Sequence, residues 1–156
     1  MAVWLTDSLF QEGKKGPEEQ GAKEDGREKF EILNLELKSG DTLKIKGKIA
    51  SDADGFVLNL GRCPDELGLH FNPRFSEAAI VCNSRSQGHW EEERRDTHLV
   101  FSPGSEVKLT VEFQGDEFRV KLPDGHEVTF PNRNNHDQIT YLCIHSGLRV
   151  TSFKYD

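Results

Sequence analysis

The chain has 156 residues, of which 30% are charged and 35% hydrophobic, and its formal net charge is −7. This length is sufficient for one domain with a hydrophobic core of its own. An acidic chain without a basic stripe is a poor candidate for binding nucleic acid or anionic membranes. No run of eighteen apolar residues occurs, so no segment is expected to insert into a bilayer.

The cysteines and the first residues indicate where the chain is made. Residues 1–10 lack a basic stretch followed by a sustained apolar one, so no secretory signal peptide is expected. Cys63, Cys82 and Cys143 are odd in number and lack metal-ligand spacing, which favours reduced thiols made in the cytosol. Cys63 lies in a predicted turn and is expected to be the most exposed of the three. We therefore expect a cytoplasmic location.

The N-terminal part divides into two compositions. Residues 11–29 are rich in Gly, Glu and Lys with almost no apolar content, which predicts a flexible segment. Residues 1–10 are more apolar because they contain Trp4, Leu5, Leu9 and Phe10. They form either an unstructured terminus or a short helix that docks on this domain or on a partner. We expect residues 1–29 to be an extension and residues 30–156 to form the domain.

From residue 30 onward the hydrophobic pattern is that of β-strands. Residues 42–49 and 107–113 alternate between polar and apolar side chains, and Pro123-Asp124-Gly125 is a strong hairpin signal. Further strands are predicted at 117–122, 126–130, 138–144 and 148–153. Many short strands at regular spacing predict an all-β antiparallel sandwich.

One predicted strand carries an unusual row of polar side chains. If residues 70–75 are extended, His70, Asn72 and Arg74 share one face and the aromatic residues between them face the other way. An imidazole, an amide and a guanidinium together offer both hydrogen-bond donors and acceptors. This mixture suits a ligand made of hydroxyl groups.

The following segments extend this polar face. Val81 and Asn83 share a face of the next strand, and Glu93 and Arg95 can form a charge pair. Trp90 precedes that pair among small and polar residues, which favours an exposed ring. An indole can cover the apolar C–H face of a pyranose, while charge-assisted hydrogen bonds hold the hydroxyl groups. The residues therefore indicate a sugar site.

The pattern His-x-Asn-x-Arg, Val-x-Asn, Trp-x-x-Glu-x-Arg resembles the carbohydrate-recognition signature of the galectins, and the similarity covers about residues 30–156. The matching positions are His70, Asn72, Arg74, Val81, Asn83, Trp90, Glu93 and Arg95. The resemblance is to prototype galectins, and residues 1–29 have no counterpart in a minimal galectin domain.

This resemblance implies a galectin-type jelly roll with the sugar groove on a concave sheet. It implies binding of β-galactosides, such as lactose and N-acetyllactosamine, and of glycoproteins that carry them. It implies no metal and no cofactor, and leaderless secretion to the cell exterior. Galectins of this form often pair through their terminal strands, which would give a homodimer that cross-links glycans. The extension leads into one of these strands and could obstruct, cover or reinforce the pairing.

Three alternatives remain beside the lectin. A glycosidase needs two facing carboxyls, one with a raised pKa, whereas the groove offers Glu93 between two arginines that favour its ionised form. The six histidines lack the close spacing of a zinc site. A protein-interaction module could keep this fold and act through the apolar N-terminal residues. We therefore expect no enzyme, and the interaction module is the main alternative to the lectin.

Overall fold

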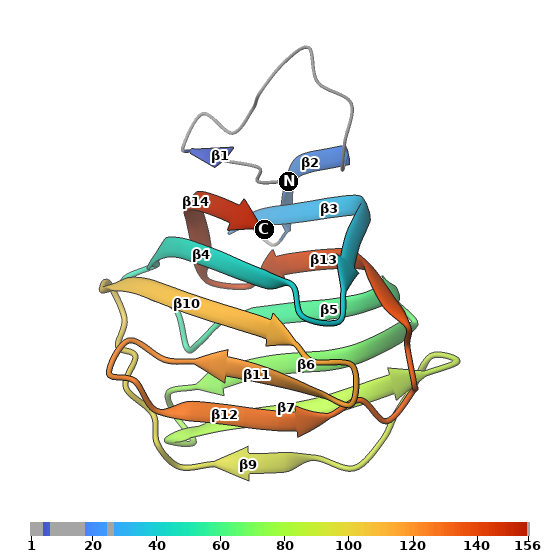
Figure 1. Cartoon of the computed structure of the whole chain (residues 1–156). Coiled ribbons are helices and arrows are strands. Elements are labelled where there is room, and N and C mark those ends of the chain that lie inside the picture. Colours follow the sequence, from blue (N-terminus) through green and yellow to red (C-terminus); the bar gives the residue numbers. More distant parts are fainter. Residues whose placement is uncertain (1–4, 7–17, 25–26, 156) are drawn as a thin grey trace.

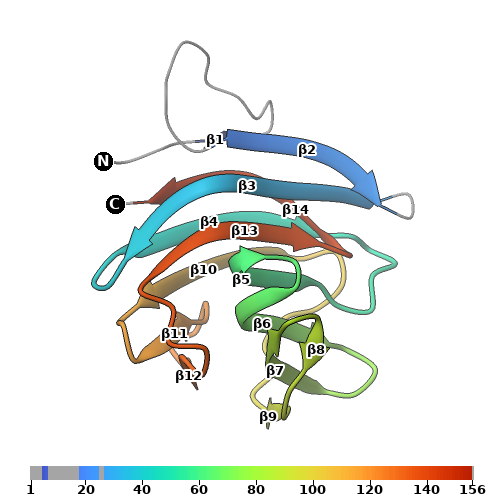
Figure 2. The ribbon, with the colours of Figure 1, turned by 90° about the vertical axis from the view of Figure 1, so that its right-hand side faces the viewer.

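The computed structural model describes residues 5–6, 18–24 and 27–155, and it describes side chains from residue 29 to residue 155. Within these ranges every helix or strand is a β-strand, and all pairings between strands are antiparallel. The strands form two sheets that pack face to face (Figures 1 and 2). The predicted antiparallel β-sandwich is therefore confirmed.

The six-stranded sheet consists, in spatial order, of β1 (Leu5–Thr6), β14 (Leu148–Tyr155), β4 (Thr42–Ile49), β10 (Glu106–Phe113), β11 (Glu117–Lys121) and β12 (Glu127–Pro131). The eight-stranded sheet consists of β2 (Glu18–Glu24), β3 (Arg27–Lys38), β13 (Gln138–His145), β5 (Val57–Cys63), β6 (Glu66–Arg74), β7 (Ala79–Ser86) and β8 (His89–Trp90), with β9 (Arg94–Asp96) also paired to β7.

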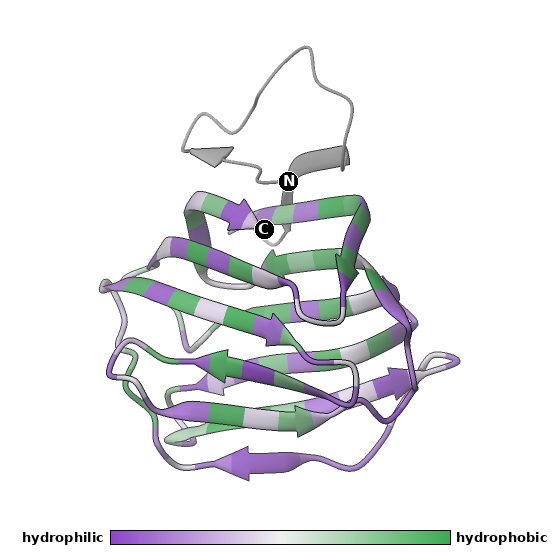
Figure 3. Ribbon diagram, viewed as in Figure 1, coloured by the Kyte–Doolittle hydropathy of each residue, from purple (hydrophilic) through white to green (hydrophobic). Residues whose placement is uncertain are grey.

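Alternation of side chains along each strand divides core from solvent. In β4, Leu43, Ile45 and Ile49 are buried while the lysines between them are exposed. The same alternation appears as bands along β4 and β10 in Figure 3. A period of two residues places one set of side chains on each face of the sheet. This pattern predicts strand positions well, and β4 has the predicted bounds.

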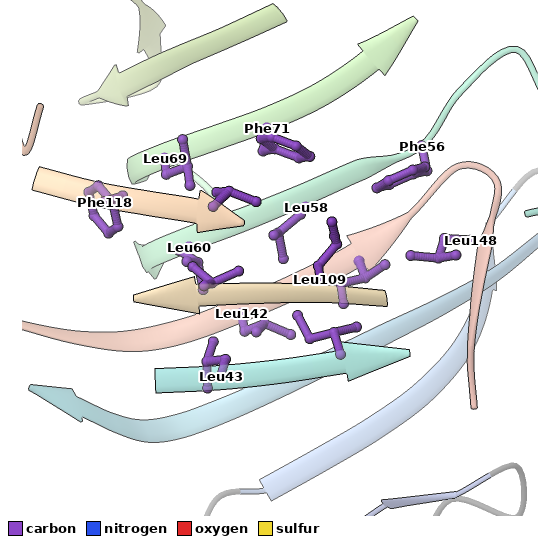
Figure 4. Packing of buried hydrophobic residues seen from close by; sticks show 14 of the residues in the cluster. Leu43, Phe56, Leu58, Leu60, Leu69, Phe71, Leu109, Phe118, Leu142 and Leu148 are labelled. Atoms are coloured by element: carbon purple, nitrogen blue, oxygen red, sulfur yellow. The ribbon is translucent and has the colours of Figure 1, made fainter. Parts of the chain in front are cut away.

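The core lies between the two sheets. Figure 4 shows leucine and phenylalanine side chains from both sheets meeting there. Phe71 of β6 is fully buried and its ring lies 6.4 Å from that of Phe56, which in turn contacts Phe101 at 5.3 Å. Burial of each such ring contributes roughly 1.5–3 kcal/mol to folding. This aromatic packing fixes β6, whose opposite face carries the polar row.

The N-terminal residues differ from the sequence prediction where they are described. Composition predicted a flexible segment over residues 11–29, but β2 pairs with β3 over Glu18–Glu24, and β3 begins at Arg27. Leu5 and Thr6 pair with β14 as a strand and not as a helix. Trp4, Leu9, Phe10 and residues 11–17 lie outside the described residues. Backbone pairing to a sheet edge needs no apolar side chains, so hydrophobic composition alone does not predict it.

The described part of the chain has no helix with the length and apolar character needed to cross a membrane.

Candidate carbohydrate-binding site

The polar row of β6 lies on the face of the eight-stranded sheet that points away from the core. His70, Asn72 and Arg74 are half-buried there, while Phe71 between them faces the core. The register places His70 opposite Asn83 of β7. The predicted division of β6 into a polar and an apolar face is confirmed, and the neighbouring strands extend the row sideways.

Position 81 links the row to β9. Asn72 lies opposite Val81 of β7, and Val81 lies opposite Arg95 of β9. Val81 is almost fully buried but is absent from the core between the sheets, so it forms the floor of the polar face. Adjacent strands therefore bring the predicted residues together from separate segments between residues 70 and 95.

His70 is held as a neutral ring with a defined orientation. Its Nδ1 lies 2.7 Å from Oδ1 of Asn59 on β5. Burial, and then the nearby His145, Arg74 and Arg85, lower the pKa of His70 to about 4. Since the amide oxygen faces the ring, Nδ1 donates to it, and Nε2 keeps its lone pair. The ring can therefore accept a hydrogen bond from a ligand hydroxyl.

Asn72 supports Arg74 more than it offers donors to a ligand. Its Nδ2 donates to the carbonyl oxygens of Phe56 at 2.8 Å and of Pro73 at 3.2 Å. Its Oδ1 accepts a hydrogen bond of 2.8 Å from Nε of Arg74. Both amide hydrogens are thus used by the backbone, and the remaining lone pair of Oδ1 is what Asn72 can offer to a hydroxyl.

Arginine and glutamate side chains alternate beside the row. Glu93 accepts from Nε and Nη2 of Arg95 at 3.3 and 3.2 Å, but lies 4.0 Å from Nη2 of Arg74. Glu77 joins the two arginines, because its carboxylate lies 2.8 Å from Nη1 of Arg95 and 3.2 Å from Nη1 of Arg74. The predicted Glu93–Arg95 pair is confirmed. The link between the two guanidinium groups is made mainly by Glu77.

The ion pairs of Glu77 favour its ionised form. The hydrogen bond from Arg95 is the main cause that lowers the pKa of Glu77, and the hydrogen bond to Glu77 raises the pKa of Arg95. A carboxylate in this setting makes a poor general acid. Its effect is instead to hold the planar guanidinium groups in place.

Asn83 anchors the segment that carries Trp90. Asn83 is only 6% exposed, its Nδ2 donates to the carbonyl oxygen of Glu91 at 3.2 Å, and its Oδ1 accepts from the backbone N–H of Ser84. The Ser84 hydroxyl also donates to Oε1 of Glu91 at 2.7 Å. One amide hydrogen of Asn83 remains available to a ligand. Asn83 therefore fixes the loop as well as extending the polar face.

Trp90 stands exposed at the end of the row. A turn at Gln87 and Gly88, both with positive φ (52° and 77°), joins β7 to β8, as expected for a two-residue hairpin. The Trp90 side chain is 48% exposed. Its ring centroid lies 4.6 Å from that of His70, and the guanidinium carbon of Arg85 lies 5.0 Å from it. The predicted exposure is confirmed, and the ring forms a wall beside the polar row.

A close backbone contact positions Arg74. Gly55 forms an isolated bridge with Arg74 and has φ of +153°. A Cβ atom at Gly55 would lie 2.0 Å from the carbonyl oxygen of Pro73. Only glycine allows the backbone this approach, so Gly55 shapes the end of β6.

Sequence reasoning did not identify three supporting residues. Asn59 orients His70, Glu77 bridges the arginines, and Arg85 packs over Trp90. Asn59 could have been identified from the sequence, because it is a polar residue within the apolar run Val-Leu-Asn-Leu. Glu77 lies three residues after Arg74, but the pairing with Arg95 depends on the fold and has no local signal.

The three thiols differ in exposure, and the acidic side chains of the described residues are not clustered with them. Among the described residues no group of three or more His, Cys, Asp and Glu side chains is arranged to hold a metal ion. Cys82 and Cys143 are buried and Cys63 is partly exposed, so the prediction that Cys63 is the most exposed thiol is confirmed. None of the three is in a disulfide. Burial raises the pKa of Cys82 to about 12, so this thiol stays protonated.

The geometry agrees with comparisons to known proteins. Residues 29–155 match the family described as galactoside-binding lectin, and the chain belongs to this family, the galectins. It is 58% identical to human galectin-2 over 125 residues, which is 80% of this chain and 95% of the relative. Members of this family are lectins, so the expectation of a lectin and not an enzyme is confirmed.

Solved structures support the same family. The crystal structure of chicken galectin 2 is 57% identical, with a TM-score of 0.80, and the alignment covers 81% of this chain and 97% of that one. A toad ovary galectin in complex with thio-digalactose is 33% identical, with a TM-score of 0.78, and the alignment covers 82% of this chain and 98% of that one. The predicted galectin-type fold is therefore confirmed.

Proposed function

We propose that the chain binds β-galactosides, such as lactose and N-acetyllactosamine, on the outer face of the eight-stranded sheet without a metal ion. The observation that carries the proposal is the exposed Trp90 ring, 4.6 Å from the His70 ring at the end of the polar row. This pairing of an aromatic wall with hydrogen-bonding groups fits one apolar face and several hydroxyl groups of a single pyranose. The contacting residues are His70, Asn72, Arg74, Val81, Asn83, Trp90, Glu93 and Arg95.

The polar row offers a route to selectivity for galactose. Galactose differs from glucose by an axial 4-hydroxyl group. Nε2 of His70 can accept from this hydroxyl, while the guanidinium of Arg74 donates to it from the other side. An equatorial hydroxyl would leave both groups unpaired, and an unpaired buried group costs more than a hydrogen bond gains. The row therefore favours the axial epimer.

Calorimetric titration of the full chain with lactose, with cellobiose as a control disaccharide, tests this proposal. Lactose should bind, cellobiose should not, and excess chelator should leave the lactose affinity unchanged. Single-site affinity is expected on the order of millimolar to micromolar. Equal binding of both disaccharides, or loss of lactose binding in chelator that calcium restores, would disprove the mechanism.

The proposed location is the cytoplasm, with leaderless export to the extracellular space. The three cysteines without disulfides suit a reducing compartment. Fractionation of cells that express the full chain, with medium collected separately, tests this location. Export should persist when the classical secretory route is blocked, and its arrest by that block would contradict the proposal.

A further inference from the structure

A dense group of lysines covers the outer face of the six-stranded sheet. We define the basic face as Lys44, Lys46 and Lys48 of β4 together with Lys108 of β10, all of which are exposed. None of the four forms an ion pair with any described residue. The sequence as a whole has a net charge of −7, but alternation along β4 places three lysines on one face, and the pairing of β4 with β10 adds Lys108.

The register aligns like charges with one another. Lys46 lies directly opposite Lys108. On the other side of β4, Lys44 lies opposite Lys154, and Lys48 lies opposite Arg149. Two acidic residues of β10 share this outer face, Glu106 opposite Lys48 and Glu112 opposite Thr42. Like charges directly opposite on a sheet are destabilising, so the pairing of Lys46 with Lys108 has a cost that a bound anion would offset.

We propose that the basic face binds a linear sulfated polysaccharide. Neighbouring lysines along β4 are about 6.6–6.8 Å apart, and adjacent strands are about 4.7–4.9 Å apart. The face therefore presents cations in two directions, along β4 and across from β4 to β10. A chain that carries charged groups at short intervals can pair with several of them at once, and release of counterions drives such binding.

The composition of the face argues for this partner over other polyanions. The large exposed hydrophobic residues among the described side chains are Trp90 and Val100, and neither lies in β14, β4 or β10. A membrane surface site would present apolar side chains for insertion, and a single-stranded nucleic-acid site would present aromatic rings for stacking. A stable protein interface would have an apolar or aromatic centre. Binding of a sulfated polysaccharide requires only cationic side chains.

The basic face and the galactoside site lie on opposite sides of the sandwich. The lysines point away from the core on the six-stranded sheet, and the polar row points away from it on the eight-stranded sheet. Binding at one face should therefore leave the other free. Lactose should not displace the polysaccharide, which separates this inference from the proposed function.

Chromatography of the full chain on immobilised heparin with a salt gradient tests the inference. The variant Lys46→Gln/Lys108→Gln removes two cations from the centre of the face. The control variant Lys38→Gln/Arg62→Gln removes two exposed cations elsewhere and gives the same net charge. The first variant should elute at lower salt, with heparin affinity about 10- to 30-fold weaker in a matched titration, by analogy with the contribution of a lysine near an anionic surface. The control should elute close to wild type.

Lactose titration of both variants verifies that each is folded, because their substitutions lie outside the galactoside site. Equal elution of the two variants would overturn the inference. Displacement of the wild type from heparin by lactose would also overturn it, since the polysaccharide would then occupy the sugar groove. Preference for phosphatidylserine vesicles or for single-stranded DNA over heparin in competition would overturn the choice of partner.

Discussion

At the scale of single residues, the site depends on how each polar group is held before a ligand arrives. Asn59 fixes the His70 ring, Asn72 fixes Nε of Arg74, and Glu77 bridges Arg74 to Arg95. Such preorganisation reduces the entropy lost on binding. The residues that support the site therefore matter as much as those that contact the sugar.

Arg74→Lys should weaken lactose binding although it keeps the charge. Lysine has no planar group that can reach Oδ1 of Asn72, the Glu77 carboxylate and a ligand hydroxyl together. We expect a loss of at least about 1.5 kcal/mol, the lower value for a hydrogen bond to a charged group. Calorimetry with lactose measures this, and an unchanged dissociation constant would count against the role of Arg74.

The pH dependence of binding should follow His70. Its folded pKa of about 4 lies below the ordinary value of 6.5, so the ring stays neutral and Nε2 can accept between pH 8 and pH 5. Lactose affinity should be constant over that range and fall as the pH passes through about 4. A fall centred near pH 6.5 would show that the ring titrates normally.

The same shift affects folding stability. As the pH falls, the His70 ring is protonated near pH 6.5 in the unfolded state and only near pH 4 in the folded state. The contribution of His70 to the free energy of unfolding is therefore complete above pH 6.5. It declines as the pH falls from 6.5 to about 4, and it is constant below that. Circular dichroism at each pH separates loss of binding from loss of fold.

At the scale of elements, the strands were predictable where side chains alternate. The strands over 42–49, 107–113 and 138–144 have nearly the predicted bounds because one face of each meets the core. β6 and its polar face were predictable for the same reason. β2 was not, because its pairing with β3 rests on backbone hydrogen bonds that composition does not reveal.

The site was predictable to a similar degree. Periodicity placed His70, Asn72 and Arg74 on one face, but it cannot show that Glu77 lies between two arginines or that Asn83 is buried under Glu91. These contacts arise from the register of β6, β7 and β9 and from the loops between them. Local patterns predict which face a residue takes, and only the fold determines its partner.

Gly55→Ala should distort the end of β6. The added methyl group would lie 2.0 Å from the carbonyl oxygen of Pro73, beside Arg74. We expect destabilisation of more than about 2 kcal/mol in urea unfolding together with weaker lactose binding. Gly125→Ala is the control, because it has φ of +93° but open space around it and should cost only about 1–2 kcal/mol. Equal effects of both would show that the contact with Pro73 is unimportant.

At the scale of the whole molecule, the N-terminal residues change which strands form the edges of the sandwich. β1 pairs with β14 and β2 pairs with β3, so neither β14 nor β3 is an edge strand in this chain. Uncovered edge strands offer unpaired backbone groups to a second copy. The segment is thus placed to cover the strands through which a dimer would pair, one of the outcomes predicted for it.

Removal of residues 1–29 should leave lactose affinity unchanged and increase self-association. The eight residues of the site lie far from β1 and β2 in the sequence, while truncation removes β1, β2 and the first three residues of β3 and uncovers β14 and the rest of β3. Sedimentation velocity of the full and truncated chains, with a lactose titration of each, measures both effects. A truncated chain that is folded but does not bind lactose would place the domain boundary before residue 30.

We propose that Trp90 and the polar row form one galactoside site. Lactose titration of the variant Trp90→Ala tests this proposal. The ring is 48% exposed and contacts the partly buried side chains of His70 and Arg85 outside the core, so its removal should leave the melting temperature nearly unchanged. Loss of stacking should cost about 1–3 kcal/mol of binding free energy, by analogy with aromatic stacking on bases. Because the affinity for a single sugar is weak, this loss removes most of it. We expect a folded variant without measurable lactose binding. A variant that binds lactose as tightly as wild type would contradict the proposal.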